Sequence, residues 1–163
     1  MADSFEISEE MASMVGWESE PWIFEVSRSS VRAFARGVGY TDRVYYDVEK
    51  AKEAGYMDLP APPTYLGTAI FIPGESHEFL PTPPGFNPDL KHNLKGLLDG
   101  GAETTYFSDI CAGDELTCVR KTTNLEKKNS KGLGDFLIVS SDLTYTNQHK
   151  KVVAVQSTQA IFY

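Results

Sequence analysis

The segment whose residue types are best suited to chemistry is GYTDRVYYD at positions 39–47, which combines two carboxylates with three tyrosines. Two neighbouring carboxylates can divide the general acid and general base roles around one substrate. Asp47 directly precedes a helical pattern, however, and is therefore predicted to cap that helix. Asp42 remains as a weak catalytic candidate, together with Tyr45.

The tyrosines of this turn allow two interpretations. Tyr40, Tyr45 and Tyr46 either contact a substrate or pack as core and interface aromatics, and the sequence leaves both open. A phenol has a pKa near 10, so a tyrosine is a poor general base at neutral pH. We therefore expect a binding role for these residues before a catalytic one.

The other polar candidates give no pattern of a metal or cofactor site. The histidines are scattered over loop or turn positions, and the two cysteines lie seven residues apart, outside the short spacings of metal ligands. Asp99 precedes Gly100–Gly101 near the expected groove, a pattern typical of a turn or bulge as well as of a site residue. No metal and no cofactor are expected. The residues concerned are His77, His92, His149, Cys111 and Cys118.

The bulk properties of the chain narrow its class. A length of 163 residues predicts one domain, 1–163. The net charge of −8 and a pI near 4.8 argue against a nucleic-acid partner, which needs clustered cations. No export signal is visible and the longest apolar stretch is too short to cross a bilayer. We expect a cytoplasmic protein with free thiols and no membrane segment.

The first half of the chain predicts short helices around one buried helix. Residues 22–26 are β-rich, and residues 31–38 carry an apolar stripe at helical spacing that ends at Gly37 and Gly39. A second helix is expected over 48–54. Prolines at 60–63 then impose an extended approach to an almost entirely apolar segment, Thr64 to Ile72, which predicts a buried helix. Residues 73–93 predict a long irregular overhang.

The second half predicts an antiparallel meander. Period-two patterns indicate strands over 102–107, 115–126, 135–145 and 151–162, with turns between them. The last strand carries apolar residues on both faces, which predicts a sheet covered on both sides. The expected fold class is α+β, with a curved antiparallel sheet wrapped around the buried helix.

Three segments in order resemble the N-terminal MaoC-like dehydratase family of the hot-dog superfamily, which includes the accessory subunits of mycobacterial (3R)-hydroxyacyl-carrier-protein dehydratases. The resemblance implies a single hot-dog fold and an acyl-CoA or acyl-carrier-protein thioester as ligand. The segments are RAFARGVGYTDRVYYDVEKAKEAGYMDLPAPPTY, LLDGGAETTYFSDICAGDEL and SSDLTYTNQHKKVVAVQ.

The resemblance also implies that the usual catalytic groups are missing. Catalytic relatives use an Asp and a His around one water, and those positions fall on Tyr40 and Tyr45. They also use a glycine N–H to polarise the thioester carbonyl, and that position falls on Pro63, which has no N–H. The residues expected to bind substrate are Tyr40, Tyr45, Tyr46, Pro63, Thr64 and Asp99.

Three functions follow from these features. The preferred one is the accessory subunit of an (R)-specific enoyl-thioester hydratase or 3-hydroxyacyl-thioester dehydratase of fatty acid metabolism, in a dimer whose catalytic MaoC-like hot-dog partner supplies Asp and His. The second is a homodimeric acyl-CoA hydratase or thioesterase that uses Asp42, Tyr45 or Asp99. The third is a non-enzymatic acyl-CoA binder.

Overall fold

The computed structural model describes residues 5–67 and 82–163. The described elements, in chain order, are α1 (Glu9–Ala12), β1 (Trp22–Glu25), α2 (Arg28–Val38), η1 (Arg43–Tyr45), α3 (Val48–Glu53), η2 (Tyr65–Gly67), β2 (Leu97–Tyr106), β3 (Glu115–Ser130), β4 (Gly134–Thr146) and β5 (Val152–Phe162), where η marks a 3₁₀ turn.

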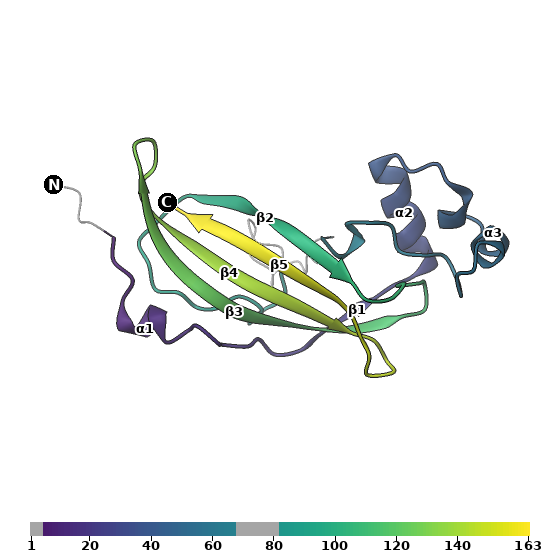
Figure 1. Cartoon of the computed structure of the whole chain (residues 1–163), viewed down its shortest axis with the longest axis horizontal. Coiled ribbons are helices and arrows are strands. Elements are labelled where there is room, and N and C mark those ends of the chain that lie inside the picture. Colours follow the sequence, from purple (N-terminus) through teal and green to yellow (C-terminus); the bar gives the residue numbers. More distant parts are fainter. Residues whose placement is uncertain (1–4, 68–81) are drawn as a thin grey trace.

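The strands form one antiparallel sheet with the order β1-β3-β4-β5-β2 (Figure 1). β3, β4 and β5 follow one another as a meander, while β2 pairs with β5 and β1 pairs with β3. β2 and β1 are therefore the two edge strands. This is the curved antiparallel sheet of the predicted hot-dog fold, and its α+β class is confirmed.

The sheet buries one face, which we call the inner face. On β4, Leu137, Val139, Leu143 and Tyr145 alternate with more exposed neighbours and are at most 9% exposed. The side chains that they oppose on β3 and β5 lie on the same face because the ladder is antiparallel. The inner face therefore forms the main core.

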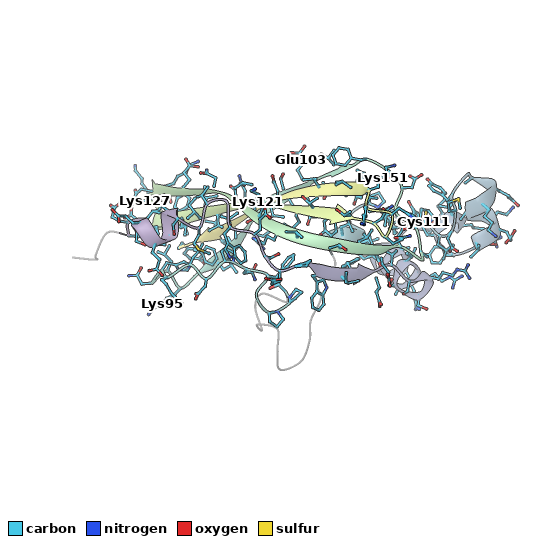
Figure 2. All side chains as sticks on the ribbon, turned by 90° about the horizontal axis from the view of Figure 1, so that it is seen from below. Lys95, Glu103, Cys111, Lys121, Lys127 and Lys151 are labelled. Atoms are coloured by element: carbon cyan, nitrogen blue, oxygen red, sulfur yellow. The ribbon has the colours of Figure 1, made fainter. Side chains whose placement is uncertain are left out.

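The opposite, outer face was predicted to be covered as well, and among the described residues no helix or strand covers it. Ser157 and Gln159 of β5 are exposed there, and Glu103 projects from the side of the sheet opposite to Lys95 (Figure 2). The apolar residues of this face, such as Val155 and Ile161, are only partly buried. Apolar patterning on both faces thus does not require a second covering layer within one chain.

The helices α2 and α3 lie together beyond one end of the sheet (Figure 1). Ser27 caps α2 in a reciprocal capping box with Ser30, and Gly39 ends the helix in the left-handed conformation, with φ of 85°. Val31 and Ala35 are buried as the stripe predicts, but Val38 is 51% exposed. None of the helices in the described ranges is long and apolar enough to cross a membrane.

The predicted buried helix is only partly within the described residues. Tyr65 and Leu66, at its start, form the η2 turn and are buried. Residues 68–72 of that prediction lie outside the described residues, as do residues 73–81 of the predicted overhang. The described part of the overhang, residues 82–93, forms no helix or strand.

A bulge explains why β2 begins five residues earlier than predicted. Its pairing with β5 shifts between Asp99 and Gly101, where Gly101 has a φ of 116° and the Asp99 carboxylate accepts its N–H at 2.9 Å. This extra residue interrupts the alternation of side chains that marks a strand in sequence. Asp99 thus has the bulge role that its neighbouring glycines indicated.

Candidate functional site

The tyrosine-rich turn is built by two capping carboxylates. Asp47 caps α3, as predicted, by accepting the N–H of Glu49 at 3.0 Å and that of Lys50 at 3.4 Å. Arg43 adds an ion pair at 2.8 Å. These contacts, the Lys50 N–H foremost, lower the pKa of the Asp47 carboxyl.

Asp42, the weak catalytic candidate, caps η1. Its carboxylate accepts the N–H of Val44 at 3.1 Å, two residues further along the chain. Such a contact is the local geometry by which an aspartate begins a turn. Asp42 does not line either of the two cavities that are described below.

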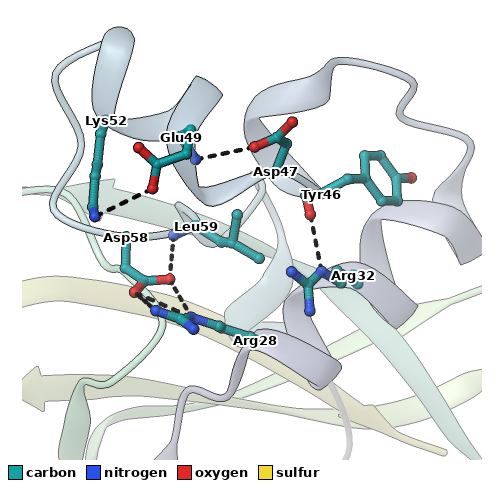
Figure 3. Close-up of polar contacts among 8 residues, drawn as sticks. All are labelled: Arg28, Arg32, Tyr46, Asp47, Glu49, Lys52, Asp58 and Leu59. Atoms are coloured by element: carbon teal, nitrogen blue, oxygen red, sulfur yellow. Dashed lines mark hydrogen bonds and ion pairs between the residues drawn. The ribbon is translucent and has the colours of Figure 1, made fainter.

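The three predicted tyrosines form one unit. The rings of Tyr40 and Tyr45 pack with their centroids 5.5 Å apart, and the Tyr46 hydroxyl donates to the Tyr40 carbonyl at 2.6 Å. Arg32 of α2 donates to the Tyr46 carbonyl at 3.0 Å (Figure 3). Tyr40 and Tyr46 thus fix the turn that presents Tyr45.

A bidentate ion pair holds the segment that leads to Pro63. Arg28, at the start of α2, contacts both carboxylate oxygens of Asp58, with the shortest distance at 2.6 Å (Figure 3). The same carboxylate accepts the N–H of Leu59 at 2.7 Å. Ala61 then donates to the Ile110 carbonyl at 2.7 Å, which places residues 59–61 beside residues 110–112.

Tyr65 anchors the η2 turn that follows. Its ring packs edge-on against Phe24 and Phe34 at 5.6 and 5.5 Å, and it is only 3% exposed. From the sheet, the Tyr145 hydroxyl donates to the Leu66 carbonyl at 3.3 Å. The position of Pro63 is therefore fixed from α2, from β1 and from the inner face of the sheet.

These elements enclose a cavity of about 450 Å³, which we call the tyrosine pocket. It brings together two residues predicted from the sequence, Tyr45 and Pro63, with residues from the end of β2 and the loop that follows. Burial, followed by the nearby Tyr40, Tyr56 and Asp42, raises the pKa of Tyr45. The lining residues are Tyr45, Tyr56, Pro60, Ala61, Pro63, Tyr106, Phe107, Ser108, Asp109 and Ile110.

The tyrosine pocket is suited to binding more than to proton transfer. Its lining residues include no histidine, and Asp109 is the only carboxylate among them. Pro63 offers no N–H, and a tyrosine whose pKa is raised has even less of the phenolate form, which would have to act as the base, at neutral pH. The pocket presents phenols and aromatic rings, which contact an acyl or aromatic ligand through apolar area and single hydrogen bonds.

Thr64, also predicted to bind substrate, is strained. Its φ of 69° is the left-handed conformation that a β-branched residue rarely adopts. A hydrogen bond from its backbone reaches Tyr106 and partly offsets the rise in the Tyr106 pKa that burial causes. Thr64 itself does not line the tyrosine pocket; it contacts Tyr106, which does.

Asp99 lies elsewhere, on a second cavity of about 830 Å³ that we call the inner-face cavity. This cavity lies against the inner face of the sheet and contains none of the other predicted site residues. Its lining residues are Thr82, Phe86, Asn87, Pro88, Asp89, Leu90, His92, Leu97, Leu98, Asp99, Arg120, Val139, Leu143, Thr158, Gln159, Ala160 and Phe162.

The sequence did not indicate four residues of these cavities. Tyr56, Tyr106 and Asp109 join the tyrosine pocket only because β2 and the loop after it meet the 56–63 segment in space. Arg120 lines the inner-face cavity from a strand whose preceding inward residues, Leu116 and Cys118, are buried and uncharged. One signal was available for Arg120, since it shares the parity of Leu116 and Cys118.

The fold and its geometry define a protein of the hot-dog class. The model of the FAS1-like dehydratase domain region matches residues 13–156, and the chain belongs to that family. It is 40% identical over 124 residues to a UPF0336 protein of Parafrankia sp., an alignment that covers 76% of each chain. The resemblance to the N-terminal MaoC-like dehydratases is thereby confirmed.

Solved structures share the fold at low sequence identity. The HadBC (3R-hydroxyacyl-ACP dehydratase) complex of Mycobacterium tuberculosis superposes with a TM-score of 0.67 at 21% identity, covering 91% of this chain and 96% of that one. The ChsH1-ChsH2 complex of the same organism superposes with a TM-score of 0.70 at 16% identity, covering 90% of this chain and 89% of that one. Both structures are complexes of two different subunits by name.

Proposed function

We propose that this chain is the accessory, acyl-binding subunit of an (R)-specific enoyl-thioester hydratase or 3-hydroxyacyl-thioester dehydratase. In this role a partner hot-dog subunit carries the Asp and His that act on water, and the tyrosine pocket holds part of the acyl thioester. The observation that supports it most is the pairing of Tyr45 with Pro63 on one pocket that lacks a histidine.

The physical argument concerns what the pocket cannot do. Hydration of an enoyl thioester needs one group to take a proton from water and one to return it. It also needs a donor to the thioester oxygen, and the loss of one such donor costs about 10²–10³ in rate. Pro63 cannot donate, and the raised pKa of Tyr45 opposes its use as a base.

A dimer is supported by the free edge of β2. This strand is ten residues long, most of its residues are exposed, and β5 is the only strand of the described residues that pairs with it. A long edge strand is commonly paired or covered in a native assembly. We propose that a catalytic hot-dog subunit, or a second copy of this chain, covers that edge.

The test of the accessory role is loss of enoyl-thioester absorbance with crotonyl-CoA and with a longer enoyl-CoA. The folded chain alone is expected to give no turnover. When the chain is mixed with a MaoC-like subunit that has the Asp/His pair, the rate of turnover is expected to be higher than the rate with that subunit alone. Turnover by this chain alone would overturn the accessory role. An equal rate with and without the chain would do so as well.

Binding by the tyrosine pocket is tested separately by titration with the non-reactive saturated acyl-CoA. Tyr45→Ala is expected to weaken binding because it removes a ring from the pocket. The matched control is Tyr163→Ala, which removes a tyrosine that does not line the tyrosine pocket. If both variants bind as the wild type does, the tyrosine pocket is not the acyl site.

A second candidate function has one observation in its favour, the carboxylate of Asp109 on the tyrosine pocket. In a homodimeric hydratase or thioesterase, Asp109 would act as the base and Tyr45 as the acid. Asp42 and Asp99, proposed for this role from the sequence, do not line the tyrosine pocket. If the chain alone shows turnover, Asp109→Asn should abolish it while Asp99→Asn should not.

A further inference from the structure

Arg120 occupies an unusual place on the inner face of the sheet. Along β3, Leu116, Cys118 and Thr122 point to that face and are at most 3% exposed, and Arg120 shares their parity. Its partner in the ladder is Leu143 of β4, which is also buried. A cation in such a row costs free energy unless its charge and its donors are matched.

The contacts of Arg120 leave that charge unmatched. One terminal nitrogen, Nη1, donates to the Asn87 side-chain oxygen at 2.7 Å, whereas Nε is buried and has no hydrogen-bond partner. Within the described ranges, no carboxylate forms an ion pair with Arg120. Burial lowers the pKa of Arg120, and the opposing contributions come from Cys118 and Tyr145 and not from a described carboxylate.

The guanidinium faces the inner-face cavity, whose size and walls suit a small molecule. Its volume of about 830 Å³ lies within the 300–1,000 Å³ that ligand sites commonly have. The strands contribute apolar walls through Leu97, Val139, Leu143 and Phe162, and Phe86 closes another side. A largely apolar cavity with one partly buried cation is complementary to an apolar molecule with one anionic group.

A second unmatched polar atom lies on the same cavity. Nδ1 of His92 is buried without a hydrogen-bond partner, and the ring packs on Phe162 at 4.5 Å. Burial lowers the pKa of His92, so the ring is neutral at pH 7 and adds a hydrogen-bonding group without adding charge. Arg120, which is partly buried, therefore remains the cation of the site.

The two carboxylates that line the cavity do not neutralise Arg120. Asp99 is exposed and accepts the Gly101 N–H, and Asp89 is exposed and forms an ion pair with Lys91. A ligand with two negative charges would meet one cation and these two acids. A single carboxylate, which matches the planar fork of a guanidinium, is the better complement.

We propose that the inner-face cavity binds an apolar molecule that carries a carboxylate, with the carboxylate on Arg120 and the apolar part along the walls from β2, β4 and β5. The site is distinct from the tyrosine pocket and does not depend on the accessory role. Binding would match the charge of Arg120 and occupy its free donors.

The probes are dodecanoate, methyl dodecanoate and dodecanol, which share one chain and differ in the head group. Isothermal titration with the wild-type chain is expected to show dodecanoate binding about tenfold or more tightly than the ester or the alcohol, as loss of a charge-assisted contact implies. Equal affinity for acid and ester, or no binding of the acid, would overturn the proposal. Neither result requires a variant.

The location is tested with Arg120→Met, which keeps the apolar stem and removes the charge. This variant is expected to bind dodecanoate about tenfold more weakly and methyl dodecanoate unchanged. Lys121→Met, the next residue on β3 but exposed and on the outer face, is the matched control and should bind as the wild type. Unchanged dodecanoate binding by Arg120→Met refutes the assignment.

If Arg120→Met does not fold, Ala160→Phe tests the same cavity by filling it from β5. This variant should no longer bind dodecanoate or methyl dodecanoate, because it removes the space for the alkyl chain that the two probes share. Retained binding of dodecanoate by folded Ala160→Phe places the acid elsewhere and overturns the proposal.

Discussion

The phenol oxygen of Tyr65 lies 2.6 Å from the hydroxyl oxygen of Ser30, a contact that joins the η2 turn to the first turn of α2. Ser30 also takes part in the capping box of α2 with Ser27. One serine thus links the start of a helix to the segment that carries Pro63. The geometry of the tyrosine pocket depends on this link.

Removing that hydroxyl should cost stability without disturbing the core. Tyr65→Phe is expected to lower the free energy of unfolding by about 1 kcal/mol, the typical net value of such a hydrogen bond. Tyr65→Ala should cost about 3–5 kcal/mol because it also empties the space between Phe24 and Phe34. Urea unfolding measures both, and a Tyr65→Phe variant as stable as the wild type would contradict the role given to this contact.

The protein should be more stable when Thr64 is replaced by glycine. Its φ of 69° costs about 1 kcal/mol for a residue with a Cβ and nothing comparable for glycine. Thr64→Gly is therefore expected to raise the midpoint of urea unfolding. Thr64→Ala is the matched control, since it removes the same hydroxyl but keeps the strain. Equal effects of the two substitutions would show that φ is not the cause.

The Arg28–Asp58 pair predicts a loss of stability in acid. The hydrogen bonds from Arg28 are the largest cause of a pKa for Asp58 below its ordinary 3.8. A lowered pKa in the folded state means that the stabilisation is complete above the unfolded pKa and is lost as the pH falls through the folded one. Unfolding followed by circular dichroism should therefore show stability falling below about pH 4.

Two variants separate Asp58 from the other acids in that experiment. Asp58→Asn should be less stable than the wild type at pH 7 and should show a shallower decline below pH 4. Glu103→Gln, which alters an exposed carboxylate with no ion pair among the described residues, should follow the wild-type curve. A decline of wild-type steepness in Asp58→Asn would assign the acid sensitivity to other groups.

Both cysteines should resist alkylation in the folded protein. Cys118 is 3% exposed and burial raises its pKa to about 12, while burial also raises the pKa of Cys111, which is 8% exposed. The thiolate is the reactive form, so little of it is present at pH 8. Mass spectrometry after iodoacetamide should find no adduct under native conditions and two adducts in urea. A native adduct would locate an opening that exposes one thiol.

The parts of the fold that depend on local signals were predictable. Asp47 caps α3 because its side chain satisfies N–H groups only two and three residues away. The cap of α2 was narrowed to Ser27 or Ser29 for the same reason, and Ser27 caps it. The alternation in the β-rich run 22–26 also placed Trp22, Phe24 and Val26 on one face, and in the structure they are less exposed than Ile23 and Glu25 between them. Each of these features is fixed within a few positions of chain.

The bulge at Gly101 and the length of the β3–β4 hairpin were not predictable in this way. The sequence indicated β2 only from Ala102, because the extra residue of the bulge inverts the alternation before it. It indicated that β3 ends at Glu126, because Lys127 to Ser130 are polar. In the structure those four residues continue to pair with β4.

Only some of the residues that line the tyrosine pocket could be predicted from the sequence. Tyr45 and Pro63 were named from their positions in a family pattern, whereas Tyr106 and Asp109 reach the pocket through the order of the strands. Asp99 and Arg120 illustrate the same limit, since their common cavity forms only when β2 and β3 belong to one curved sheet. Periodicity shows which face a side chain takes, not which distant residue it meets.

The exposed edge of β2 also determines how the protein should be handled. The N–H and C=O groups on this edge of the ten-residue strand have no partner strand in the part of the chain that the structure describes, and they can pair with an extended chain, including the same strand of another copy. Overproduction without a binding subunit therefore favours insoluble aggregates, and the yield of soluble material should rise with the dose of a co-expressed subunit. Solubility on co-expression is thus a screen for the proposed partner subunit that requires no substrate.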